Sequence, residues 1–302
     1  MNKKKIILVA LFPIVLLGIW YFFIKDYNYK ITFKTHQVPG IVYHHILEWN
    51  DGEPKNNKVI NLIEKHPFNH INQELKSGDT IYNLDWQIIK ENDTTSFITL
   101  KIKDESHSFK QNLQAIFYKN DFVKRRISNV MELRSYMNDK TKFYKISKIS
   151  KDTLSSVNCA YITLESNTTN KAMTMVSNIS LVMSYIKDND IELTGNPFSE
   201  ITSWNMDNDS IKFNFCFPIK EMEKYPESDI VKIKKSIPKS GIKVDYNGNY
   251  STSHLAWYRL MDYAKTNNIN INNLPVEIYR NDPHLGGDAT KWLAEIYMPI
   301  QP

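Results

Sequence analysis

Residues 277–283 read EIYRNDP and residues 292–300 read WLAEIYMPI, and these two segments decide the expected fold of the C-terminal half. The second segment alternates as a β-strand does, so that Glu295 shares one face with Leu293 and Tyr297 while the opposite face is wholly apolar. The apolar face suits a core. A carboxylate between an apolar and an aromatic neighbour favours a pocket wall on the other face.

A repeat extends this pattern over the C-terminal half. Residues 183–191 read MSYIKDNDI, and residues 261–269 read MDYAKTNNI. Each copy is expected to be strand, helix, strand, strand, over residues 157–219 and 239–302, within a domain of residues 154–302. Neither copy is long enough to bury a core alone, so the two are expected to share one antiparallel sheet with both helices on one face.

The N-terminus predicts a membrane anchor within residues 1–26. Residues 6–24 are apolar and uncharged, and in a helix they would just cross a ~30 Å hydrocarbon core. Three lysines at 3–5 precede them, which predicts a cytoplasmic N-terminus and soluble domains on the outer side of a single-pass membrane protein. A cleaved signal peptide is the alternative, but no small-residue cleavage site follows the apolar run.

Residues 27–146 predict a second α+β domain. The expected order is a strand at 30–34, a helix at 41–49, several strands of which the last is 108–118, and a long helix at 122–137. This order resembles the helix-grip fold of the SRPBCC, or START-like, domains. The resemblance implies an apolar cavity between sheet and long helix. Residues 147–156 are polar and predict a linker.

The charge and the cysteine content limit the kinds of partner and cofactor that are expected. The formal charge is +5 and the sequence pI is about 8.8, but the lysines are mixed with acids. Because neither a basic face nor a reading motif is present, nucleic-acid binding is not expected. Cys159 and Cys216 could form a disulfide if the chain is exported, although two small buried strand residues are favoured. No cofactor is expected, and no metal site, because no Cys or His cluster has ligand spacing.

The C-terminal half carries a sharper resemblance. Residues 247–250 (NGNY), 279–283 (YRNDP) and 295–300 (EIYMPI) resemble the GyrI-like, or AraC-type effector-binding, domain. Members of that family take up hydrophobic, often cationic, small molecules in a groove between two pseudo-symmetric halves. The resemblance implies that Glu295 is the groove carboxylate and that Tyr279 forms an aromatic wall. The usual His-x-Gly before the first helix is absent, which leaves the role of that histidine open.

The remaining candidate ligand-binding residues follow from the repeat and from aromatic content. Asn214 is the repeat partner of Glu295, and Tyr297 shares its face, whereas Trp257 and Trp292 would line the groove or lie in the core. A buried carboxylate needs a partner, which a cationic ligand with aromatic neighbours would supply. The alternative is that Glu295 pairs with a lysine or arginine of its own domain.

These observations predict a membrane-anchored protein that senses or sequesters an amphipathic or cationic organic molecule. The first alternative is a hydrolase of reactive xenobiotics, with Glu295 as base and Tyr279 as orienting group. The second is an envelope module that handles lipid through its first domain. Binding is expected rather than catalysis, and no catalytic residue is assigned.

Overall fold

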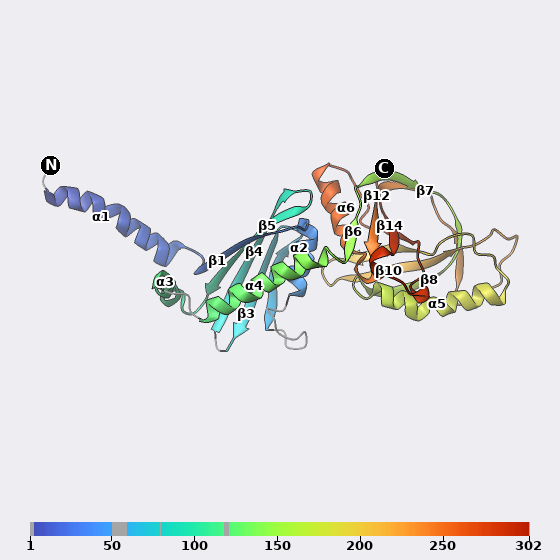
Figure 1. Ribbon diagram of the computed structural model, residues 1–302, viewed down its shortest axis with the longest axis horizontal. Helices are drawn as coiled ribbons and strands as arrows, with labels where there is room; N and C mark the ends of the chain where they lie inside the picture. Colours follow the sequence, from blue (N-terminus) through green and yellow to red (C-terminus); the bar gives the residue numbers. More distant parts are fainter. Residues whose placement is uncertain (1–2, 50–58, 79, 118–120, 302) are drawn as a thin grey trace. The chain divides into compact units, whose positions relative to one another are not determined.

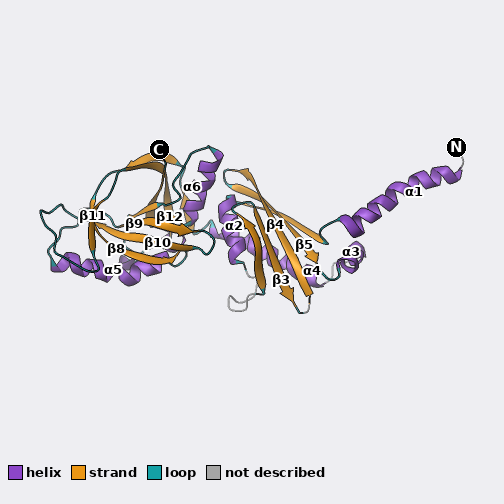
Figure 2. Ribbon diagram, turned by 180° about the vertical axis from the view of Figure 1, so that it is seen from behind, coloured by secondary structure: helices purple, strands orange, loops and turns teal. Residues whose placement is uncertain are grey.

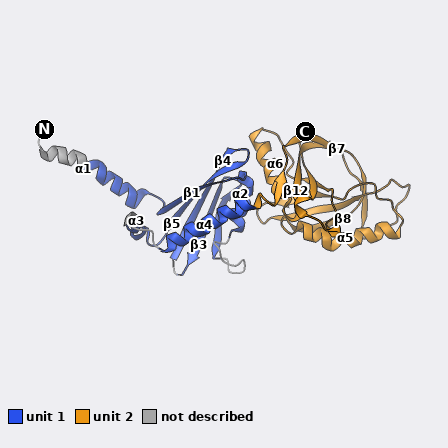
Figure 3. Ribbon diagram, viewed as in Figure 1, with its two compact units in different colours: residues 1–139 blue, residues 140–302 orange. Residues whose placement is uncertain are grey.

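The computed structural model describes residues 3–49, 59–78, 80–117 and 121–301. The chain divides into two compact units, residues 1–139 and 140–302 (Figure 3). Each unit has its own antiparallel sheet with helices. The expectation of a mixed α+β chain with antiparallel sheets is therefore confirmed.

The predicted transmembrane anchor is wrong. The N-terminal helix α1 (Lys3–Ile19) has 17 residues and is followed by a π-helical turn, η1 (Trp20–Ile24). At 1.5 Å per residue, α1 extends about 26 Å, and its first turn is lysine. Among the helices of the described residues, none is both long enough and apolar enough to cross a membrane. The predicted single-pass topology, with its domains on the outer side, is therefore not supported.

The first unit is built on a five-stranded sheet of order β1-β5-β4-β3-β2 (Figure 1). Its strands are β1 (Tyr29–Thr35), β2 (Ile60–His66), β3 (His70–Ser77), β4 (Thr80–Asn92) and β5 (Thr95–Asp104). Its helices after α1 are α2 (Pro39–Glu48), α3 (Ser108–Phe117) and α4 (Asp121–Lys140). Pro39 at the start of α2 suits a first helical turn, where its missing N–H has no partner to lose.

One face of this sheet forms the core of the unit. Strand β4 alternates, so Leu84, Trp86 and Ile88 are buried on one side. They pack in one cluster with residues of α2 and with Val130 and Met137 of α4, which runs across that face in Figure 1. The opposite face carries polar side chains, among them Asp85, which pairs across to Lys101 of β5.

Two segments differ from the sequence expectation. Residues 108–118 were expected as a strand, but Ser108–Phe117 is helix α3. Phe109 and Leu113 lie four residues apart. This spacing places them on one side of a helix, but it also places them on one side of a strand, so it does not distinguish the two. Residues 150–154, expected within a linker, form strand β7 against β12.

The second unit has a nine-stranded antiparallel sheet, and six of its strands come from the two repeats. The first repeat contributes β8 (Asn158–Asn167), α5 (Lys171–Asp188), β9 (Phe198–Asn205) and β10 (Ser210–Pro218). The second contributes β12 (Lys239–Gly248), α6 (Leu255–Thr266), β13 (Val276–Tyr279) and β14 (Leu293–Pro299). Strands β9 and β13 are neighbours, so the repeats meet at the middle of the sheet. Helices α5 and α6 of the two repeats are labelled in Figure 2. Cys159 and Cys216 are buried and not bonded to each other.

Two short segments, residues 155–157 and 236–238, connect strands on opposite sides of this sheet and are called the crossing segments below. Beyond the repeats lie β6 (Tyr144–Ile146), β7 (Ser150–Leu154) and β11 (Lys232–Lys235). Strand β7 pairs with β12 and continues through 155–157 into β8, while β11 pairs with β8 and continues through 236–238 into β12. The crossing segments are bonded to each other, with Ser236 N donating to Val157 O at 2.8 Å. The sheet therefore curls around a partly open cavity.

The core of the first unit gives a stability prediction. Met137→Ala removes a fully buried side chain from the contact between α4 and the sheet, so we expect a loss of about 2–5 kcal/mol in the free energy of unfolding. Urea denaturation followed by circular dichroism measures it. Lys124→Ala, on an exposed part of the same helix, should change stability by no more than about 0.5 kcal/mol. Equal effects of the two variants would contradict the packing described.

Candidate ligand-binding site

Strand β13 divides the second unit into two chemically different faces. Glu277 and Tyr279 point to one side, and Val276 and Ile278 to the other, because successive side chains of a strand alternate. The first side is covered by α5 and α6, since residues of both helices contact Glu277. The second side faces the partly open cavity described above. A site on one side therefore cannot use residues of the other.

The helix side contains a fully buried ion pair. Lys171, in the first turn of α5, donates through Nζ to Oε2 of Glu277, and neither side chain is exposed. Tyr279 donates to the same oxygen at 2.7 Å, and Trp257 Nε1 donates to Oε1 at 2.5 Å. Burial raises the pKa of the Tyr279 hydroxyl well above its ordinary value, so this group stays a donor at neutral pH. The carboxylate of Glu277 thus has protein partners at both oxygens.

The other side holds a cavity of about 310 Å³. Its floor is formed by central strands of both repeats, with Phe198, Val276, Ile278 and Tyr297 as the main apolar and aromatic groups. Its roof is formed by the crossing segments, from which Leu154, Val157, Ser236 and Ile237 line it. A mostly apolar, partly open cavity with a few charged groups in its lining is typical of a small-molecule site.

Glu200 is the acid that borders this cavity. It receives hydrogen bonds from Lys234 and from Lys239, the latter at 2.5 Å from Oε1. Burial by itself raises the pKa of Glu200, but the two lysines outweigh burial and hold it below its ordinary value. Glu200 is therefore ionised and paired at neutral pH.

Glu295 is a second paired acid on the same side. Lys243 Nζ lies 3.1 Å from Oε2, and Arg280 Nη2 lies 2.8 Å from Oε1. Burial raises the pKa of Glu295, yet the bonds from Lys243 and Arg280 bring it below its ordinary value of 4.5. Of the two possibilities that the sequence leaves open, the structure shows the ion pair within the domain.

The six residues predicted to bind ligand fall on both sides of the sheet. Tyr297 lines the cavity, and its hydroxyl donates to Glu295 at 3.1 Å. Asn214 pairs across strands with Glu200 and accepts a bond from Thr163, so it belongs to the same side. Glu295 borders the cavity through its partners Arg280 and Tyr297.

Tyr279, Trp257 and Trp292 belong to the helix side. Tyr279 pairs with Ala294 rather than with Glu295, and it is buried beside Glu277 together with Trp257. Trp292 packs on Tyr250, which in turn contacts Tyr279. Since Tyr279 and Glu295 point to opposite faces, they do not form the base and orienting group of one hydrolytic site.

Sequence reasoning missed the central members of both sites. Glu277 precedes Tyr279 by two residues, so period-two alternation already places the two on one face. Lys171 and Glu200 carried no such signal, because their partners lie far away in the sequence, on other strands. Lys171 is one lysine among many in the sequence, and only the fold shows it to be buried.

Comparison with known proteins gives likenesses of fold. No family model matches the chain, and no curated protein matches it. Among solved structures, the C-terminal domain of EcmrR is 16% identical, with 51% of this chain and 97% of that chain covered at a TM-score of 0.45. EcmrR in its complex with DNA is also 16% identical, covering 63% of this chain and 74% of that chain at a TM-score of 0.45. SAV2435 bound to tetraphenylphosphonium is 11% identical, covering 51% and 94% at a TM-score of 0.34. At these values the likenesses assign no ligand to this chain.

The buried ion pair gives a second stability prediction. Lys171→Met removes the cation that Glu277 pairs with in the core, so we expect a loss of about 3–5 kcal/mol in the free energy of unfolding. The double variant Lys171→Met with Glu277→Gln should lose less than the two single losses combined. Urea denaturation of the full chain measures all three. Lys212→Met, which breaks an exposed pair with Glu165, is the control and should cost at most about 1 kcal/mol.

The pairing of Glu295 predicts a pH dependence. Because its pKa in the folded state lies below the ordinary 4.5, the pair contributes stability above that pH and loses it as the pH falls through the lower value. Glu295→Gln should therefore cost about 1–3 kcal/mol at pH 7, and the difference from wild type should shrink below pH 4.5. Denaturant titrations at pH 7, 5 and 3.5 measure this. If the difference in the free energy of unfolding between wild type and Glu295→Gln did not change with pH, the charge of this carboxylate would not be what stabilises the folded state.

Proposed function

We propose that residues 140–302 form a small-molecule-binding module whose cavity takes an amphipathic organic molecule. The observation that carries the proposal is the cavity of about 310 Å³ between the central strands and the crossing segments. Its lining is more apolar than polar, and burying the apolar part of a ligand away from water is the main favourable term in binding. The charged residues at its border then orient a polar head.

The charges at the border bear on the head group. Lys239 and Arg280 line the cavity together with Glu200, and both Glu200 and Glu295 already have two cations each. The cationic ligand that the sequence predicts would have to displace a lysine or arginine from its carboxylate. A neutral or anionic head would instead meet Lys239 and Arg280 without breaking a pair. We therefore expect neutral or anionic amphiphiles to bind more tightly than permanent cations.

SAV2435, one of the solved structures similar to part of this chain, was solved bound to tetraphenylphosphonium, and that cation is included in the test panel. A hydrolytic function has no specific support in the geometry, because Glu295 is held by Lys243 and Arg280 and is separated by the sheet from Tyr279. Binding is the function that the contacts favour.

A cavity-filling variant tests the proposal. We expect saturable binding of one molecule of 8-anilinonaphthalene-1-sulfonate (anionic) or N-phenyl-1-naphthylamine (neutral) per chain, measured by dye fluorescence. Ile278→Phe replaces an aliphatic side chain in the cavity floor by a larger aromatic ring and should weaken binding at least tenfold. Ile230→Phe makes the same change at an exposed position of the same unit and should leave binding unchanged.

Two outcomes would contradict this function. The first is equal binding by wild type and Ile278→Phe, which would place the dye elsewhere. The second is the absence of saturable binding for both dyes and for tetraphenylphosphonium. Preference for the phosphonium, lost in Ile278→Phe, would keep the cavity as the site and reverse the expected head-group charge.

A further inference from the structure

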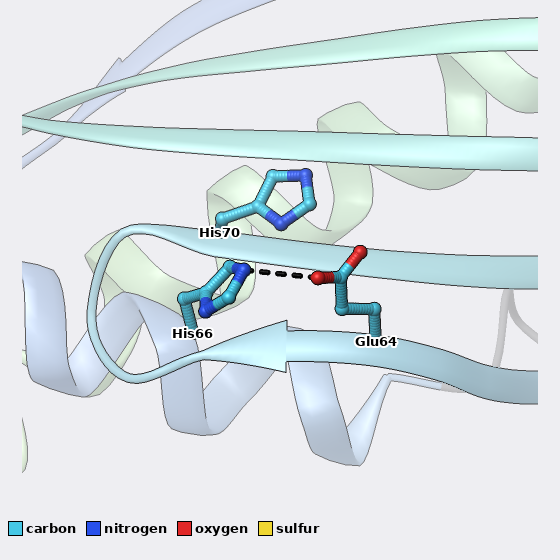
Figure 4. Close-up of side chains that lie close together, drawn as sticks. All are labelled: Glu64, His66 and His70. Carbon is cyan, nitrogen blue, oxygen red and sulfur yellow. Dashed lines mark ion pairs between the residues drawn. The ribbon is translucent and has the colours of Figure 1, made fainter.

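We propose that Glu64, His66 and His70 of the first unit bind a divalent transition-metal ion of the Zn²⁺ type. The three side chains converge at the end of the hairpin formed by β2 and β3 (Figure 4). One possible ligand atom from each lies within 4.8 Å of the others. Two imidazoles and one carboxylate, with the remaining position open, are a donor set that Zn²⁺ uses in proteins.

The hairpin brings these side chains to one face of the sheet. His66 pairs directly with His70, and Glu64 pairs with Asn72. A β-bulge between Leu62 and Glu64 supplies one extra residue to β2. Without it, Glu64 and His66 would lie on the same side as Leu62, because a shift by one residue moves side chains to the other face. The bulge therefore turns both ligands toward His70.

The turn that joins the strands is held in one conformation. Phe68, at its centre, has a positive φ of 70°, which is unfavourable for a residue with a side chain. Its ring packs edge-on against Tyr43 at 5.8 Å and is partly buried in the core of the unit. Such packing offsets the backbone strain and fixes the separation of His66 and His70, whose rings are 5.6 Å apart.

His70 is oriented as a ligand by a second carboxylate. Its Nε2 lies 2.6 Å from Oδ1 of Asp85, on the neighbouring strand, and Lys101 lies 3.5 Å from the other oxygen of Asp85. A histidine that donates through one nitrogen to a carboxylate presents the other, unprotonated, to a metal. The Nδ1 of His70 is buried and has no hydrogen-bond partner among the described residues. A buried nitrogen of this kind needs an explanation, and a bound ion provides one.

The other two ligands are free to adjust. His66 and Glu64 have side chains that are 61% and 56% exposed, and His66 Nε2 lies 3.0 Å from Glu64 Oε1. Zinc bonds of about 2.0–2.2 Å bring ligand atoms to roughly 3.3 Å from one another, so small rotations of these two side chains close the site around His70. The sequence did not predict this site, because 64, 66 and 70 become neighbours only through the bulge and the turn.

Zinc titration of the full chain tests the assignment. Competition against a chromophoric zinc indicator at pH 7.5 should give one site per chain, and Co²⁺ should produce a visible absorption band. His66→Ala and His70→Ala should each weaken Zn²⁺ binding at least tenfold. Asp85→Asn, which replaces the charged acceptor of His70 by a weaker neutral amide, should weaken it by about 10–100-fold. His36→Ala, an exposed histidine of the same unit, is the matched control and should change nothing.

His66 is exposed, so its variant is expected to fold, and circular dichroism of each variant checks this. The proposal is overturned if the wild type takes up no Zn²⁺ at stoichiometric concentration. It is equally overturned if His36→Ala weakens binding as much as His66→Ala and His70→Ala do, because the ion would then bind to histidines in general. Dye binding in the second unit is a separate measurement, so failure of one proposal is distinguishable from failure of the other.

Discussion

The buried ion pair between Lys171 and Glu277 is the constraint on which the second unit depends. Two charges taken out of water cost several kcal/mol each unless every polar atom finds a partner. Here Lys171 comes from the first repeat and Glu277 from the second, and Trp257, Tyr279 and Ser253 also donate hydrogen bonds to the carboxylate of Glu277. The pair is satisfied only when α5, α6 and β13 meet in one register. We take this to be a source of specificity, since apolar contacts alone fix register less strictly.

Because the polar network lies on the helix side of β13, the opposite side of the strand is available to line the cavity. Glu277 and Tyr279 are buried in the core beneath the helices, whereas Val276 and Ile278 face the cavity. The pleat of a strand separates the two sets completely. Substitutions on the cavity floor can therefore change which molecule fits without disturbing the network that holds the two repeats together.

The sequence predicts features that depend on neighbouring residues, such as the alternation of a strand. It does not predict contacts between strands that lie far apart along the chain. The alternation in 293–299 correctly separates Glu295 from Ala294, since it depends only on the period of a strand. The partners of Glu295 were not predictable, because Lys243 reaches it through the pairing of β12 with β14. Strand β7 has the polar sequence SKDTL with no apolar alternation, and its extended form comes from hydrogen bonds to β12.

Errors in the first unit have the same origin. The run 108–117 contains too few apolar residues to distinguish a strand from a helix by period, and tertiary packing decides in favour of α3. The apolar N-terminus was correctly seen as helical in part, but its α-helix ends at Ile19, which composition does not show. In the hairpin, the bulge beside Glu64 reverses the side on which two residues lie, and no periodic pattern predicts an irregularity.

The ion pairs of Glu200 link the floor of the cavity to the crossing segment that forms part of its roof. Lys234 precedes the crossing segment 236–238 and Lys239 follows it, and both bond to Glu200 on the floor strand β9. The segment is thus tied down at both ends by a single carboxylate. Lifting it to admit a molecule would draw both cations from Glu200 and leave a mostly buried charge unpaired, a cost of several kcal/mol. A neutral or anionic ligand that leaves these two ion pairs intact avoids this cost, so the pairing of Glu200 with Lys234 and Lys239 favours such ligands over cations.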